Sequence, residues 1–231
     1  MNTNRDFKMM LLDKFGIVDE PKTIDFCREA YKFLTEDEAQ AQTPAAPAPV
    51  CSDKAIPDDG VYLIYSDNSY CKYDEGCKKE DVKYIGIIHE GHAFAITLKD
   101  LGRYQLLKDE AECEDNSEFY LPRECDALND WECEKRTKRI QELGTDIPLA
   151  DGEFIPALPM LVAMCYWRNK GLDEALKAVG GEPFSDSNYW SVTENSSNGA
   201  WFVSFSDGNV YYYGYTEYNG FVVRPVVAFP L

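Results

Sequence analysis

Hydrophobic and polar positions alternate at both ends of the region after residue 60, which indicates β-strands, and the residues between them follow helical spacing. The predicted strands cover 61–65, 84–88, 92–98, 188–192, 200–206, 209–214 and 221–229. The predicted helices cover 130–143, 157–169 and 172–179, the last ended by Gly180-Gly181. An acidic, cysteine-bearing stretch at 109–128 is predicted to be irregular. Strands, then helices, then strands again predict an α+β fold.

The strand at 200–206 has two distinct faces, because successive side chains point to opposite sides of a sheet. One face carries Trp201, Val203 and Phe205, which we expect to form the core. The other carries Phe202, Ser204 and Ser206, which we expect to point to solvent.

The first fifty residues have a different pattern. Apolar residues recur at helical spacing over 5–15 and 22–38, and 39–50 is an Ala/Pro segment typical of extended linkers. We therefore expect a helical segment at 1–38 for attachment or homo-oligomer assembly. After the linker, 51–231 is expected to be a display domain.

Tyrosine dominates the stretch 211–219, mixed with glycine, asparagine and glutamate. Tyrosine offers a large, stiff, amphipathic contact surface, and small polar residues supply adaptable hydrogen bonds. This composition is typical of a recognition surface rather than of a core strand.

Four segments frame this stretch: YWS-x-TE at 189–194, AW-x-V-x-F at 200–205, GNV at 208–210 and VRPV-x-AF at 223–229. They resemble the C-terminal variable region of target proteins of diversity-generating retroelements. The serine usual in that family's YWSSTE motif is Val192 here. The resemblance is specific over 187–229, with 60–107 more loosely resembling the family's first hairpin.

The resemblance implies a C-type lectin-like fold, preceded here by the short helical segment, and a face diversified by adenine mutagenesis during reverse transcription. It implies a role in receptor recognition, at a phage tail tip or on a cell surface, with an unknown protein or glycan of a target cell as partner. No catalytic activity, cofactor or metal is expected. The residues expected on the variable face are Asn195, Ser196, Ser197, Asn198, Phe202, Ser204, Ser206, Asp207, Asn209, Tyr211, Tyr212, Tyr213, Tyr215, Glu217, Tyr218, Asn219 and Phe221.

The formal net charge of −18 limits the classes of molecule that the chain is expected to bind. Nucleic acid binding requires clustered Lys and Arg, so nucleic acid is not an expected partner. No apolar run has the length of a transmembrane helix, so membrane insertion is not expected. The first twenty residues lack the apolar segment of a secretory signal, which favours a virion or cell-associated location.

Histidine, glutamate, arginine and cysteine side chains elsewhere in the chain are expected to have structural rather than catalytic roles. His89-Glu90-Gly91-His92 lacks the metalloprotease spacing and is predicted to be a hairpin turn. Glu194 and Arg224 are expected to hold loops by hydrogen bonds or to pair with each other. None of the eight cysteines forms a C-x-x-C pair, although Cys71 and Cys77 flank one short acidic loop.

Three alternative functions remain open, one of which is a purely structural or regulatory cytosolic module. A calcium-dependent sugar-binding lectin would need oxygen ligands, which Asp207, Asn209, Glu217 and Asn219 supply. A relative of formylglycine-generating enzymes would share the expected fold, but that activity depends on a cysteine pair in the C-terminal half, and no cysteine follows Cys165.

Overall fold

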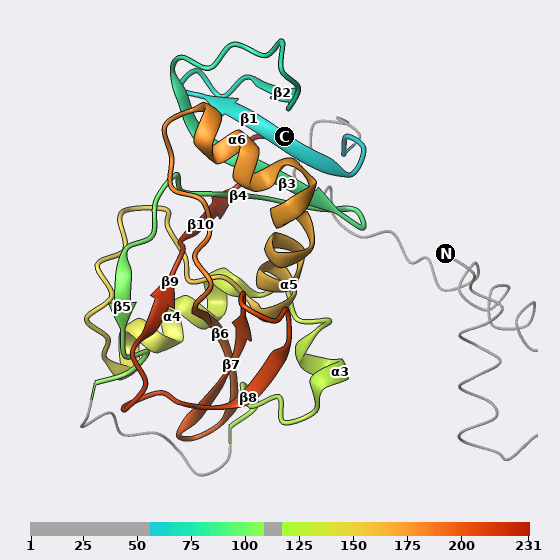
Figure 1. The fold of residues 1–231 in the computed structure, drawn as a ribbon. Coiled ribbons are helices and arrows are strands. Elements are labelled where there is room, and N and C mark those ends of the chain that lie inside the picture. Colours follow the sequence, from blue (N-terminus) through green and yellow to red (C-terminus); the bar gives the residue numbers. More distant parts are fainter. Residues whose placement is uncertain (1–55, 109–116) are drawn as a thin grey trace, which may run out of the picture. The chain divides into compact units, whose positions relative to one another are not determined.

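The computed structural model describes residues 56–108 and 117–231, which belong to one compact unit, Lys54–Leu231 (Figure 1). The predicted helices at 5–15 and 22–38 and the linker at 39–50 lie outside the described residues. So do the first residues of the predicted display domain and part of the acidic loop, 109–116.

One five-stranded sheet joins the two ends of this unit. Its strands are β1 (Gly60–Tyr65), β2 (Tyr70–Lys72), β3 (Val82–His89), β4 (His92–Ile96) and β10 (Val226–Ala228). They are ordered β10-β4-β3-β1-β2 with every pair antiparallel. The last described strand, β10, therefore lies in the same sheet as the first described strand, β1.

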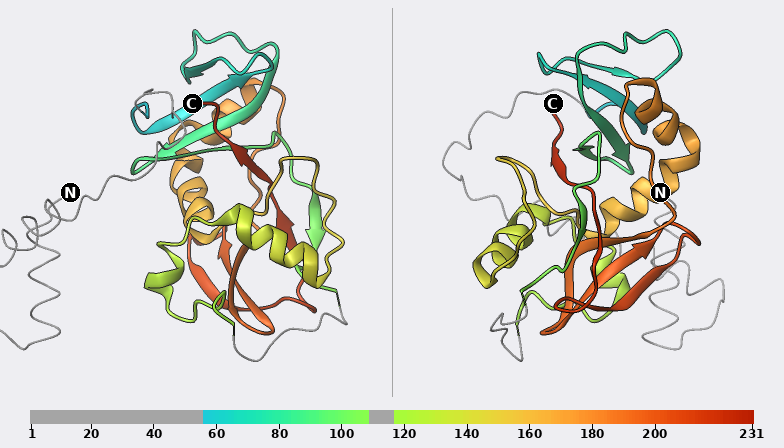
Figure 2. Two further views of the ribbon diagram at one scale, coloured as in Figure 1. Left: turned by 180° about the vertical axis from the view of Figure 1, so that it is seen from behind. Right: turned by 60° about the vertical axis from the view of Figure 1, so that its left-hand side comes forward.

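A second five-stranded sheet carries the tyrosine-rich part of the chain. Its strands are β5 (Gly102–Tyr104), β6 (Asn188–Ser196), β7 (Gly199–Ser204), β8 (Val210–Tyr215) and β9 (Phe221–Val223), in the order β5-β9-β6-β7-β8. The pairing is antiparallel except between β6 and β9. Figure 2 shows the two sheets as separate layers of the unit.

The described helices lie between β5 and β6 in the sequence. They are α3 (Glu124–Ala127), α4 (Cys133–Leu143), α5 (Leu158–Trp167), the kinked turn η1 (Arg168–Leu172) and α6 (Asp173–Ala178). Helix α5 is apolar on all sides, which is typical of a buried helix. It contacts β3 of the first sheet and β6 and β7 of the second.

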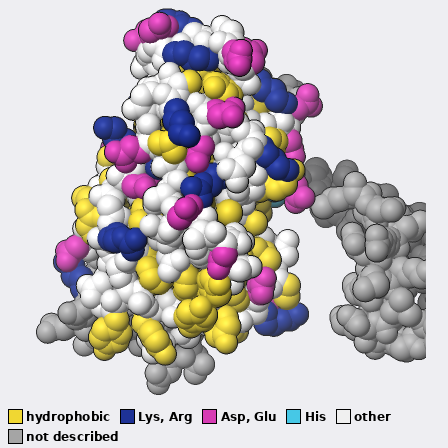
Figure 3. Space-filling model, viewed as in Figure 1, with side chains coloured by type: hydrophobic (Ala, Val, Ile, Leu, Met, Phe, Trp, Pro, Cys, Tyr) yellow, Lys and Arg dark blue, Asp and Glu magenta, His cyan; other side chains and the backbone are white. Residues whose placement is uncertain are grey.

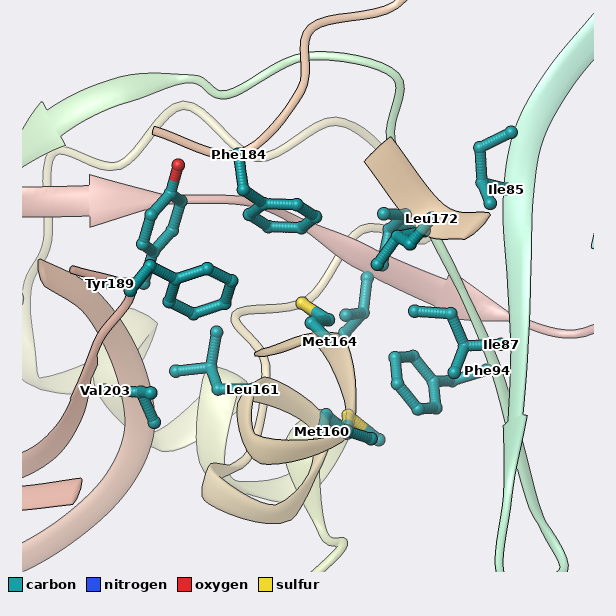
Figure 4. Close-up of a cluster of buried hydrophobic side chains, with 14 of the residues drawn as sticks. Ile85, Ile87, Phe94, Met160, Leu161, Met164, Leu172, Phe184, Tyr189 and Val203 are labelled. Carbon is teal, nitrogen blue, oxygen red and sulfur yellow. The ribbon is translucent and has the colours of Figure 1, made fainter. Parts of the chain in front are cut away.

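The main core fills the space between the sheets around α5 (Figure 4). Ile85 and Ile87 reach it from β3, Met160 and Met164 from α5, and Val203 from β7. Trp201, Val203 and Phe205 are all buried in this cluster, as the alternation of the strand predicted.

A second cluster covers the opposite face of β6 and β7. It contains Trp190, Val192 and Phe202 from these strands, together with Leu106 from the loop after β5 and Ile140 from α4. Both faces of the central strands of the second sheet are therefore buried.

The predicted α+β class is confirmed, and the predicted strands and helices after residue 60 have observed counterparts with one exception. The single strand predicted over 221–229 is two strands, β9 and β10, which are interrupted at Arg224-Pro225 and belong to different sheets. The short strands β2 and β5 and the one-turn helix α3 were not expected from the sequence. Within 56–108 and 117–231, no helix combines the length and apolar character that crossing a bilayer requires.

Candidate ligand-binding face

The β7–β8 hairpin carries four tyrosines, Tyr211, Tyr212, Tyr213 and Tyr215. Ala200 pairs with Gly214 and Phe202 with Tyr211, so one residue of β7 opposes two residues of β8. This is a β-bulge, a device that bends a strand and re-aims its side chains. The two residues on the bulged strand are Tyr212 and Tyr213, and the bulge sends them to different neighbours. The Tyr212 ring lies 5.9 Å from Trp201 and the Tyr213 ring 5.6 Å from Phe202, centroid to centroid.

Four tyrosines of this hairpin and the loop after it form a surface that we call the tyrosine face: Tyr212, Tyr213, Tyr215 and Tyr218. Their exposed fractions are 63%, 57%, 53% and 77%. Hydrophobic side chains gather at the end of the molecule formed by β6, β7 and β8 (Figure 3). Gly214 and Thr216 lie within the same stretch but are buried, so the exposed tyrosines alternate with residues that pack inward.

The seventeen residues predicted for the face fall into three groups. The exposed ones are Asn198, Ser206, Asp207, Asn209, Tyr212, Tyr213, Tyr215 and Tyr218. The half-buried ones are Asn195, Ser196, Ser197, Tyr211, Glu217, Asn219 and Phe221. The remaining two, Phe202 and Ser204, are buried at 2% and 4% exposure.

The expectation that Phe202 and Ser204 point to solvent is therefore wrong. The alternation was correct, since Phe202 lies on the opposite side of the sheet from Trp201. That side is covered by the second hydrophobic cluster, where Phe202 lies 4.6 Å from Phe221 and 5.3 Å from Tyr211, measured between ring centroids. Phe202 supports the face from below rather than forming its outer surface.

Both tryptophans of the frame are held by hydrogen bonds to segments distant in sequence. Trp190 Nε1 donates to the Tyr104 carbonyl at 2.8 Å, and Trp201 Nε1 donates to the Leu121 carbonyl at 2.8 Å. A buried indole N–H needs such a partner. Trp190 therefore anchors β5, and Trp201 anchors the loop that contains Leu121.

The small polar residues of the YWS-x-TE segment satisfy buried backbone groups. Ser191 Oγ donates to the Trp201 carbonyl at 2.8 Å, and Thr193 Oγ1 accepts from the Leu158 N–H at 3.1 Å. The second bond satisfies the first N–H of α5, which has no intrahelical partner. Strand β6 is thus tied to both β7 and the buried helix.

Glu194 and Arg224 do not pair with each other, so that alternative in the prediction is wrong. Glu194 Oε2 accepts from Arg139 Nε at 2.9 Å, with Glu194 only 1% exposed. Burial raises the pKa of Glu194, and the Arg139 guanidinium opposes that rise.

Arg224 is fully buried and lies in the short segment that connects β9 of the second sheet to β10 of the first. Its guanidinium donates to Asp100, to the Thr97 carbonyl at 3.2 Å and to the Glu182 carbonyl at 3.0 Å. Asp100 also accepts from the Tyr189 hydroxyl at 3.0 Å. The expected role in holding loops is therefore observed for Arg224, with Asp100 joining two frame segments.

Two pockets open on the tyrosine face, and Tyr213 lines both. The first has a volume of about 360 Å³ and is lined by Pro122, Asn195, Ser196, Asn198, Gly199 and Tyr212 to Tyr215. The second has a volume of about 390 Å³ and is lined by Asn188, Phe202, Ser204, Asp207, Tyr211, Tyr213, Asn219 and Phe221. The residues expected from the sequence thus contribute to two adjacent hollows.

A hydrogen-bonded turn places a carboxylate at the second pocket. Asp207 Oδ1 accepts from the Asn209 N–H at 3.0 Å, and Oδ2 accepts from the Tyr211 hydroxyl at 2.8 Å. These bonds, the backbone one foremost, lower the pKa of Asp207 to about 2. The bond to Asp207 raises the pKa of Tyr211. The predicted tight turn at 207–209 is confirmed, with Gly208 at φ +75°.

The four residues that could supply oxygen ligands for calcium do not all line one pocket. Asp207 and Asn219 line the second pocket, whereas Asn209 and Glu217 do not. Asn219 Oδ1 already accepts from the Tyr215 N–H at 2.8 Å. Among the residues that the structure describes, no group of three or more His, Cys, Asp and Glu side chains is arranged to hold a metal ion.

The remaining chemical candidates have structural surroundings. The segment at 89–92 forms the predicted hairpin turn between β3 and β4, and His92 stacks on Trp131 at 3.9 Å between ring centroids. Cys71 and Cys77 are free thiols with sulfur atoms 2.8 Å apart. Burial raises the pKa of Cys165, which is also a free thiol.

Comparison with known proteins gives one distant structural neighbour to report. No protein-family description and no curated protein matches the sequence. The described fold is similar to the crystal structure of a fimbrial protein from Bacteroides ovatus ATCC 8483, with a TM-score of 0.47 and 14% sequence identity. The match covers 75% of this chain and 49% of that one, so it spans about half of the fimbrial chain's length.

Proposed function

We propose that this chain is a ligand-binding protein whose C-type lectin-like domain displays a retroelement-diversified face for receptor recognition. The face consists of the tyrosine face and its neighbouring turns, and it binds a protein or glycan on a target cell. The chain acts by binding alone, without catalysis or a cofactor.

One observation carries this proposal: exposure follows the division between the framing segments and the tyrosine-rich segment. The frame residues Tyr189 to Glu194, Trp201 and Arg224 are buried. Four of them, Tyr189, Trp190, Trp201 and Arg224, are hydrogen-bonded to residues distant in sequence. The four residues of the tyrosine face are more than half exposed. Residues on such a surface can change without disturbing the core, which a diversified binding site requires.

The arrangement of the terminal strands supports the lectin-like fold within this proposal. Strand β10 pairs with β4 in the sheet that contains β1, so both ends of the domain meet in one sheet. The second sheet and its loops are left to carry the variable segment.

The test compares the full chain with a variant in which Tyr212, Tyr213, Tyr215 and Tyr218 are all serine. Both are applied to arrays of glycans and of cell-surface proteins. We expect the wild-type chain to bind a small set of array members and the variant to lose them, with thermal unfolding nearly unchanged. Surface substitutions usually change stability by about 0.5 kcal/mol or less each.

The matched control is Tyr166→Ser, which removes a tyrosine of 47% exposure on α5, outside the face. This control should bind as the wild type does. EDTA should leave binding unchanged, and its loss on chelation would favour the calcium-dependent lectin instead. A quadruple variant that keeps the wild-type binding pattern would contradict the proposal.

A further inference from the structure

The pocket beside the β7–β8 turn is lined by four aromatic rings. Phe202 forms the buried floor, with Tyr211 at 5.3 Å and 27° and Tyr213 at 5.6 Å and 85°. Tyr211 and Tyr213 are 5.3 Å apart with their planes at 59°. Phe221 closes a further side, 4.6 Å from Phe202. Ring faces carry the negative part of the aromatic quadrupole, so such a box attracts cations.

Asp207 adds a full negative charge to this pocket. Its oxygens accept hydrogen bonds from the Asn209 N–H and the Tyr211 hydroxyl, and the Ser204 and Asn209 side chains also bond to it. Asp207 is exposed, so its negative charge is accessible to a ligand. No Lys or Arg lines the pocket among the described residues. Arg103, on β5, donates instead to the Gly220 carbonyl at 3.2 Å and to Ser187 Oγ at 3.0 Å.

We propose that this pocket is a subsite for a cationic side chain, an arginine or lysine presented by a protein partner. The inference rests on the proposed function and specifies the ligand chemistry of the same face. The volume of about 390 Å³ equals roughly a dozen water molecules at ~30 Å³ each, which is ample for one extended side chain. A partner carrying a cation would also be attracted by the chain's net charge of −18.

The neighbouring pocket provides an internal contrast. It shares Tyr213 but is lined by asparagine and serine side chains and by no carboxylate. Its polar groups suit neutral hydrogen-bonding partners, so the cation is assigned to the Asp207 pocket alone.

The experiment titrates the ¹⁵N-labelled full chain with N-acetyl-arginine N-methylamide and, separately, with the citrulline analogue. Citrulline has nearly the same shape as arginine but no charge. We expect the arginine probe to shift amide resonances over 204–221 and to bind more tightly than the citrulline probe by about fivefold or more. Asp207→Asn should remove most of this preference.

The control variant is Glu217→Gln, which removes the same charge from the loop after β8 without altering a residue that lines the pocket. It should keep the arginine preference. A second variant, Tyr213→Leu, keeps an apolar wall but removes a ring face, and it should weaken arginine binding while Asp207 is intact.

The outcomes separate this inference from the proposed function. Equal binding of arginine and citrulline at 204–221 would overturn the cationic subsite while leaving a ligand-binding face. Equal losses in Asp207→Asn and Glu217→Gln would also overturn it, because general charge would then explain the preference. Absence of any shift with arginine would overturn it too, and the array experiment would then decide separately whether the face binds other ligands.

Discussion

Gly214 is the residue of the tyrosine-rich stretch whose replacement should cost most for its size. It lies between Tyr213 and Tyr215, and a Cβ added to it would lie 2.6 and 2.8 Å from two atoms of the Trp190 ring. It would also lie 3.0 Å from Cδ1 of Phe202. Contacts under 3.0 Å are essentially absent from real Cβ atoms, so the ring or the strand must move.

The size of the effect follows from how firmly these rings are held. Trp190 is fully buried and its Nε1 is hydrogen-bonded to the Tyr104 carbonyl, so the ring has little freedom to shift. Overpacking a core typically costs about 1–3 kcal/mol. Replacing glycine by alanine in a strand also gains about 0.5–1 kcal/mol of conformational free energy, which partly offsets that cost.

Gly220→Ala is the matched control, because a Cβ at Gly220 meets no atom within 4 Å. The gain in conformational free energy is common to both variants and cancels in the comparison. Gly214→Ala should therefore be less stable than Gly220→Ala by about 1–3 kcal/mol. Urea unfolding followed by tryptophan fluorescence measures the difference. Equal midpoints for the two variants would refute the packing of Gly214 against Trp190.

Three further predictions address the core, the turn and the thiols. Trp201→Ala should cost about 3–5 kcal/mol, the range for a buried aromatic, and a denaturant midpoint equal to that of the wild type would show that Trp201 is not core. The Asp207 carboxyl carbon should titrate in NMR with a pKa of about 2, rising toward the usual value of about 3.9 in Tyr211→Phe. The stability this turn gains from ionised Asp207 should be complete above pH ~4 and lost as the pH falls through about 2; an unchanged pKa in the variant would refute the hydrogen bond. Oxidised glutathione should join Cys71 and Cys77, whose sulfur atoms are 2.8 Å apart, with a mass loss of about 2 Da by mass spectrometry; two thiols still free to alkylate would contradict this.

The local pattern of the chain predicted its elements well, because each depends on nearby residues. The alternation over 200–206 identified Trp201 and Val203 as core, and their burial confirms it. The stretch at 157–169 was predicted to be a helix, and α5 covers Leu158–Trp167 of it. The tyrosines expected to be exposed at 212, 213, 215 and 218 are exposed.

The errors concern features set by residues distant in sequence. Phe202 lies on the predicted side of the sheet, but α4 and the loop after β5 cover that side, and no strand period reveals what covers a face. Glu194 pairs with Arg139, 55 residues earlier, and the frame segments alone gave no signal of that partner. The first pocket likewise combines residues of β8 with the β6–β7 turn, and the second combines residues of β8 with Asp207 of the β7–β8 turn and Phe221 of β9.

Sequencing the gene for this chain in many related isolates tests diversification of the face most directly. If the face is diversified, amino-acid differences between copies of the gene should concentrate at exposed positions such as Tyr212, Tyr213, Tyr215 and Tyr218. They should coincide with adenines of a near-repeat of the segment encoding 187–229, located beside a reverse transcriptase gene. The buried frame residues Trp190 and Trp201 should stay unchanged. Differences spread evenly over frame and face, with no such repeat, would contradict the account.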